Sequence, residues 1–192
     1  MAIQLSKGQR IDLTKNDPTL QKITIGLGWD VKHFDGGQDY DLDASVFLLN
    51  ANDKCRNELD FIFYNNLQSP DGSVVHTGDN RTGEGDGDDE SIQIDLTRVP
   101  KDVEKIAITV TIHDAESRGQ NFGQIANAFV RLVNEDTNNE VLRYDLGEDF
   151  SIETAVVFCE IYRHNGDWKF SAVGSGYQGG LQSLVRAYGL DA

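Results

Sequence analysis

The chain has 192 residues, of which 39% are hydrophobic, and this is long enough to bury a substantial core in one domain. Its 32 acidic and 17 basic residues give a formal net charge of −15 at pH 7. Such a negative surface repels phosphate backbones and anionic lipids, which argues against nucleic acid and membranes as direct partners and favours a cation or a basic protein.

Targeting signals and cysteine use indicate the compartment. The N-terminal residues contain no apolar run of signal-peptide length, and no later run could span a bilayer. Cys55 and Cys159 show neither metal nor redox spacing, and a disulfide framework is not indicated. We therefore expect a cytoplasmic protein. Cys55 could instead be a reactive thiol that binds a metalloid, but an unreactive thiol is the favoured interpretation.

Alternation of apolar and polar residues with a period of two is the dominant pattern along the chain. It occurs in residues 23–27, 42–48, 92–96 and 106–112. Residues 60–64 are rich in strand-forming side chains, and further strands are expected at residues 129–133, 141–146, 155–162 and 168–173. Many short strands separated by Gly, Asn and Asp are typical of an antiparallel sandwich or barrel. Asn165-Gly166 predicts a hairpin between the last two strands, because a type I′ turn needs positive φ at both positions.

Helical patterns are sparse. Residues 116–128 could form a short helix, although Gly119 and Gly123 weaken it. Residues 181–188 predict a C-terminal helix because their apolar side chains share one face. No internal repeat or linker is evident. The sequence therefore predicts a single mainly β domain over residues 1–192, an antiparallel β-sandwich with one or two short helices.

Acidic residues are concentrated in two segments, of which residues 30–43 are the first. In an extended chain Asp39, Asp41 and Asp43 would point to the same side. This spacing also begins an EF-hand, but the sixth position would be Ala44 instead of Gly and the twelfth Asn50 instead of Glu. The segment is therefore not an EF-hand.

The second acidic segment, residues 78–90, contains six carboxylates and one arginine in thirteen residues. Three glycines alternate there with acids, so the backbone can curl while hard oxygen donors recur. Calcium prefers six to eight such oxygens in flexible geometry, whereas magnesium demands strict octahedral geometry and keeps its waters. A phosphate would be repelled by these acids. The pattern favours calcium over both, and zinc is not indicated because the histidines lack ligand spacing.

A solvated acidic loop is the alternative interpretation of such a charge run. Two carboxylates held about 4 Å apart repel by roughly 4 kcal/mol at an effective dielectric constant of about 20. A domain is stable by only about 5–15 kcal/mol, so several carboxylates cannot converge without a cation. Two acidic segments, each next to an apolar strand, favour calcium. Asn65-Asn66 could add amide oxygens, and turn residues are nearly as good an explanation there.

Catalytic motifs are not evident. His113 and Asp114 are adjacent at the end of a strand pattern, where neighbours point to opposite faces, so no dyad is expected from adjacency. No nucleophile elbow, Walker loop or zinc-protease motif is present. We therefore expect no enzyme. A hydrolase in which a metal bound by the acidic loops activates water is the alternative function.

Four sequence blocks together resemble the TerD family of bacterial tellurite-resistance and general stress proteins. They are GLGWD (26–30), DLDAS (41–45), FIFYNN (61–66) and GDNRTGEGDGDDE (78–90). The resemblance extends from residues 5–8 to residues 176–180 and is most specific in the last block. It implies a calcium-binding β-sandwich, usually with two ions, no established enzymatic activity and a cytoplasmic role in tellurite resistance.

Carried onto this sequence, the resemblance implies a set of calcium ligands. They are Asp30, Asp41, Asp43, Asn65, Asp79, Asn80, Gly83, Gly85, Asp86, Asp88, Asp89 and Glu90. Calcium would neutralise and order the acidic loops and so create a surface for a partner. The expected function is a calcium-ordered binding or scaffold module, with other proteins of the same stress system as partners. Metalloid detoxification through Cys55, which Cys55→Ser would abolish, is a third hypothesis.

Overall fold

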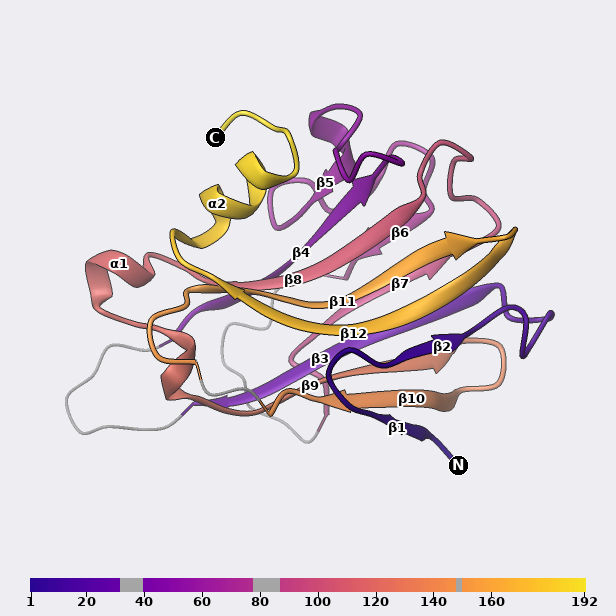
Figure 1. The fold of residues 1–192 in the computed structure, drawn as a ribbon, viewed down its shortest axis with the longest axis horizontal. Helices are drawn as coiled ribbons and strands as arrows, with labels where there is room; N and C mark the ends of the chain where they lie inside the picture. Colours follow the sequence, from indigo (N-terminus) through magenta and orange to yellow (C-terminus); the bar gives the residue numbers. More distant parts are fainter. Residues whose placement is uncertain (32–39, 78–86, 148–149) are drawn as a thin grey trace.

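The computed structural model describes residues 1–31, 40–77, 87–147 and 150–192. Two six-stranded sheets pack face to face within these residues (Figure 1). The first sheet has the order β1-β10-β9-β3-β7-β6. Its strands are β1 (Ile3–Leu5), β10 (Asn139–Asp145), β9 (Ile125–Asn134), β3 (Lys22–Val31), β7 (Glu90–Asp95) and β6 (Val74–His76). All neighbours are antiparallel except β1 and β10, which are parallel.

The second sheet has the order β2-β12-β11-β8-β4-β5 and is antiparallel throughout. Its strands are β2 (Arg10–Asp12), β12 (Asp167–Tyr177), β11 (Ala155–His164), β8 (Lys105–Ile112), β4 (Leu42–Leu49) and β5 (Phe61–Ile62). Asn165 and Gly166, with φ of 51° and 84°, form the turn between β11 and β12. The predicted β-sandwich and its hairpin are therefore confirmed.

The strand β4 is buried along its whole length, although its sequence alternates. On one face Ala44 and Val46 belong to the main core between the two sheets. On the other face Phe47 and Leu49 belong to a smaller apolar cluster, which the C-terminal helix also joins through Leu184. A layer on each side of the second sheet therefore buries both faces of this strand.

The helices are short. They are α1 (Ala115–Arg118), α2 (Gly180–Ala187) and the 3-10 turns η1 (Glu58–Asp60) and η2 (Phe122–Gln124). The prediction at 181–188 is confirmed by α2. The helix expected at 116–128 is wrong in length, because Gly119 ends α1 in a left-handed conformation with φ of 63° and β9 begins at Ile125. No helix in the described ranges is both long and apolar enough to cross a bilayer.

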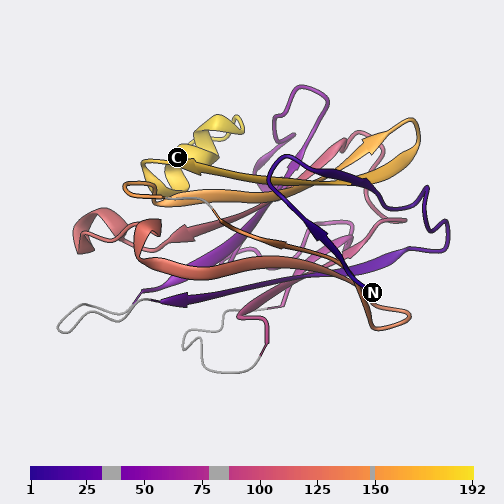
Figure 2. The same ribbon diagram turned by 60° about the horizontal axis from the view of Figure 1, so that its bottom comes forward.

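One end of the sandwich gathers the segments that carry the sequence-predicted site. Figure 2 shows the two sheets as stacked layers, with α2 outside the second sheet. β3 ends at this end, β4 and β7 begin there, and β8 leads from it into α1. The described parts of the two acidic segments, residues 30–31, 40–43 and 87–90, are thus brought to the same end by the antiparallel pairing.

Candidate functional site

Two strands from opposite sheets are tied together at this end by Glu90, the first residue of β7. The backbone N–H of Ala44 in β4 donates to Glu90 Oε2 over 2.7 Å. His76 Nε2, from β6, lies 3.3 Å from the same oxygen and 3.2 Å from the Ala44 carbonyl oxygen. His76 and Glu90 are each 3% exposed. These buried contacts fix the start of β4 against the start of β7.

The two acids before Glu90 lie against β3 and β9. Arg131 of β9 pairs with Asp88 through Nε and Nη2, at 2.8 and 2.9 Å. A Cβ atom at Gly26 would overlap the Asp88 carboxylate, so the glycine makes room for this pair. Asp89 Oδ2 accepts a hydrogen bond of 2.8 Å from the Trp29 backbone N–H. Sequence reasoning did not identify Arg131, which lies 43 residues from Asp88 along the chain.

Asp30, near the end of β3, completes a group of neighbouring carboxylates. Its Oδ2 accepts a hydrogen bond of 2.7 Å from Asn127 Nδ2. Burial raises the pKa of Asp89, and the negative charges of Asp30 and Asp88 raise this pKa further, against the hydrogen bond from Trp29. Asp30 and Asp88, one from each predicted segment, therefore lie close enough to Asp89 to repel its carboxylate. We call Asp30, Asp43, Asp88, Asp89 and Glu90 the acidic edge.

The other predicted ligands have different settings. Asp43, 8% exposed, has Oδ2 4.0 Å from His113 Nδ1. The carbonyl oxygen of Asp41 accepts a hydrogen bond of 2.8 Å from the His113 backbone N–H. Asn65 lies in an exposed turn closed by the bridge between Phe63 and Asn66. The remaining predicted ligands, Asp79, Asn80, Gly83, Gly85 and Asp86, lie outside the described residues.

The donor chemistry of the acidic edge fits calcium, because its side chains offer only carboxylate oxygens. Asp88 and Glu90 already use oxygens on Arg131 and on Ala44. Among residues 1–31, 40–77, 87–147 and 150–192, no group of three or more His, Cys, Asp or Glu side chains is arranged to hold a metal ion. Asp30 and Asp89 likewise each accept a hydrogen bond, from Asn127 and from Trp29. The described acids could therefore supply at most part of a coordination shell.

His113 and Asp114 do come together, contrary to the sequence-based expectation. His113 Nε2 lies 3.4 Å from Asp114 Oδ2. The expectation assumed extended chain, whereas β8 ends at Ile112 and Asp114 is left-handed, with φ of 51°. This turn places the Asp114 carboxylate next to the His113 imidazole. His113 thus lies between two acids, Asp43 and Asp114.

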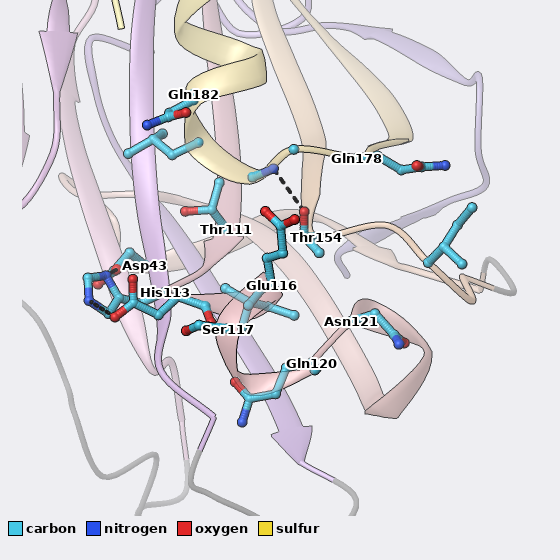
Figure 3. Close-up of a pocket in the computed structure, with 18 of the residues that line it drawn as sticks. Asp43, Thr111, His113, Glu116, Ser117, Gln120, Asn121, Thr154, Gln178 and Gln182 are labelled. Atoms are coloured by element: carbon cyan, nitrogen blue, oxygen red, sulfur yellow. Dashed lines mark hydrogen bonds and ion pairs between the residues drawn. The ribbon is translucent and has the colours of Figure 1, made fainter.

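A pocket of about 900 Å³ adjoins the acidic edge and shares Asp43 with it. Figure 3 shows it between α1, the first turn of α2, the end of β8 that carries Thr111 and the residue before β11, Thr154. Its labelled side chains are mostly amides, hydroxyls and carboxylates. Sequence reasoning missed this pocket, because its lining comes from several segments that each read as an ordinary polar loop.

Both cysteines are buried thiols. Cys55 is 9% exposed and Cys159 0%, and neither forms a disulfide. Burial, followed by the negative charge of Asp60, raises the pKa of Cys55 from 9.0 to about 12. Burial also raises the pKa of Cys159. Because the thiolate is the reactive form, neither residue is set up as a metalloid nucleophile at neutral pH.

We expect Cys55 to react with Ellman's reagent about a thousandfold more slowly in the native protein at pH 8 than in urea, from its thiolate fraction alone. Because the pKa of Cys55 is higher in the folded protein than in the unfolded chain, the neutral thiol stabilises the folded state. This stabilisation is complete below pH 9.0 and is lost as the pH rises toward about 12. Cys55→Ala should therefore lose less stability than the wild type over that range in urea titrations. Equal reaction rates in the native and unfolded protein would contradict the burial of this thiol.

Comparison with known proteins identifies relatives over the whole chain. The TerD domain model matches residues 1–188. General stress protein 16U of Bacillus subtilis (strain 168) is 62% identical over 99% of this chain and 98% of its own length. The tellurium resistance protein TerD of an Alcaligenes species is 62% identical over 100% of both chains. An uncharacterized B. subtilis protein, YceE, is 69% identical over 99% of both.

Solved structures support the same fold. A protein of unknown function aligns with a TM-score of 0.72 and 22% identity, over 90% of this chain and 99% of that one. A homologue of a telluride resistance protein from Streptomyces coelicolor A3(2) aligns with a TM-score of 0.67 and 22% identity, over 86% and 95%. At this identity the two alignments speak for the architecture alone.

Proposed function

The chain belongs to the TerD family, and we propose that it is a stress-response protein that binds calcium at its acidic edge. Its relatives include a tellurium resistance protein and a general stress protein. We therefore propose a part in tellurite resistance or in a related stress response in the cytoplasm. In this proposal the protein acts as a calcium-ordered binding or scaffold module for other proteins of that system rather than as an enzyme.

The observation that carries the calcium proposal is the convergence of Asp30, Asp88 and Asp89 at the start of β7. The charges of the first two raise the pKa of the third, although a hydrogen bond from Trp29 opposes the shift. Arg131 offsets part of this negative charge at Asp88. The negative charges of Asp30 and Asp89 have no such partner among the described residues, and a divalent cation would neutralise them.

The protein's own groups hold this region in place from several sides. Trp29 and Asn127 orient Asp89 and Asp30 by donating hydrogen bonds to them. Glu90 fixes the edge between the two sheets through Ala44. Calcium, when bound, would supply the positive charge that lets both acidic segments approach. The segments that meet there would then present one ordered surface to a partner protein.

Calcium titration of the protein after EDTA treatment tests the proposal, by calorimetry and by NMR of the backbone amides. We expect heat of binding, shifts at residues 29–30 and 88–90, and a rise in Tm of several degrees at saturation. The double variant Asp30→Asn, Asp89→Asn should bind calcium at least about tenfold more weakly, because two carboxylate ligands are lost.

The matched control is Asp136→Asn, which removes an exposed charge from the turn between β9 and β10. This control should bind calcium as the wild type does. Calcium affinity unchanged in the double variant, or a wild type whose Tm does not respond to calcium, would rule the proposal out.

A further inference from the structure

The pocket between α1 and α2 has a chemistry of its own, separate from the calcium proposal. Its volume of about 900 Å³ is in the range of small-molecule sites. It lies where β8 ends, where the chain enters β11 and where α2 begins, so rigid strand ends frame it. Figure 3 shows polar side chains around it, with Glu116 and Ser117 from α1 on one side and Gln182 from α2 on the other.

The charge of the lining has one sign. Asp43, Asp114 and Glu116 bring carboxylates to the pocket, and no lysine or arginine lines it within the described residues. His113 lies between two of these acids, 4.0 Å from Asp43 and 3.4 Å from Asp114. Together with the overall charge of −15, this lining repels anions and attracts cations.

Glu116 is the central acid of the pocket. Figure 3 shows its side chain extending from α1 across the pocket toward Thr154 and the start of α2. Within the part of the chain that the structure describes, its carboxylate forms no ion pair or hydrogen bond. Thr154 Oγ1 is engaged with the Gly180 N–H at 2.8 Å. Glu116 is an exposed residue, so its carboxylate faces the space and is accessible to a bound cation.

Apolar surface completes the lining. Tyr64, Ile152 and Leu181 border the same space, and Tyr64 and Ile152 are 42% and 57% exposed. Such surfaces pack against methylene groups, and a tyrosine face also attracts a cation. Amide and hydroxyl oxygens, among them those of Thr111 and Gln182, offer further acceptors for an ammonium group with its three donors.

We propose that this pocket binds a primary ammonium group carried on a flexible alkyl chain, with Glu116 as the principal charge partner. Free polyamines and the lysine side chains of a partner protein share this chemistry. A metal ion fits less well, because the described acids of the lining are not arranged as a group that could hold one, and the apolar border would be left without a role.

Calorimetric titration with spermidine, and separately with a short oligolysine peptide capped at both ends, tests the proposal. Each titration is run in about 150 mM salt, which screens diffuse attraction to the negative surface. Each is repeated in saturating calcium and in EDTA. We expect one or both probes to bind in both conditions, with backbone amide shifts at residues 111–117, 154 and 178–182.

Glu116→Gln keeps the shape of the side chain and removes its charge. It should weaken binding about tenfold or more, since charge-assisted hydrogen bonds are lost. The control Glu135→Gln removes an equal charge from the opposite end of β9, where Glu135 accepts a hydrogen bond from Thr24. This control should change the affinity less than twofold, and the oligolysine peptide with acetylated side chains should not bind.

The outcomes separate the sources of the amine. Binding of spermidine alone assigns the pocket to free polyamines, and binding of the peptide alone assigns it to a lysine of a partner protein. Failure of both probes overturns the proposal. Equal weakening in both variants, or loss of amine binding when calcium saturates the protein, would also overturn it, because the amines would then be occupying the general surface or the acidic edge.

Discussion

Glu90→Ala is expected to lower the free energy of unfolding by about 2–4 kcal/mol, in EDTA as much as in calcium. The variant takes the acceptor away from the Ala44 N–H, which is buried between the sheets. It also removes the carboxylate beside His76, itself only 3% exposed. A buried donor that loses its partner costs its full desolvation penalty. Urea denaturation followed by circular dichroism measures the loss.

Glu90→Gln is the matched variant for this prediction. Its side-chain oxygen can still accept from Ala44, so we expect less than half of the loss seen for the alanine variant. The comparison also bears on the predicted ligand set, in which Glu90 appears. If the alanine variant were as stable as the wild type in EDTA and less stable only in calcium, Glu90 would act mainly as a ligand and not as a tie between the sheets.

The sequence predicted the long strands because each carries several alternating apolar residues. The strands that it missed, β1, β2 and β6, have three residues each and lie at sheet edges, too short for alternation to be recognised. The helix expected at 116–128 combined α1 with the start of β9, whose apolar residues have a strand period. The helix ends at Gly119, which is left-handed; the sequence showed that this glycine weakens a helix but not that it ends one.

The candidate site was predictable in its chemistry and not in its contacts. The acids of the two segments could be read from the sequence, and β3 and β7 do bring Asp30, Asp88 and Asp89 together. Their partners could not be read, since Arg131 and the Ala44 N–H reach them across long sequence separations. A backbone donor leaves no signal in the side-chain sequence, so only the position of β4 relative to the first sheet reveals this hydrogen bond.

Phe47→Ala is expected to destabilise the protein by about 3–5 kcal/mol, the usual cost of removing a buried phenyl ring. Phe47 is 0% exposed and stacks on Phe61 with ring centroids 4.7 Å apart. Its other neighbour is Tyr188, directly after α2, also at 4.7 Å. The ring thus joins the outer face of the second sheet to the C-terminal helix. Urea denaturation gives the global loss, and hydrogen exchange of residues 180–188 should show local opening of α2.

Phe63→Ala distinguishes the loss of aromatic stacking on Phe61 from the loss of the contact with the C-terminal helix. Phe63 is half-buried and stacks on Phe61 at 4.1 Å, one ring further from α2. We expect a smaller loss of stability and unchanged exchange in α2, and equal effects of the two variants would contradict the role assigned to Phe47.

The first turn of α2 forms one wall of the pocket that holds Glu116. Loosening α2 by Phe47→Ala should therefore weaken amine binding while calcium affinity at the acidic edge is retained, because Asp30, Asp88 and Asp89 are held by β3, β7 and β9 and not by the helix.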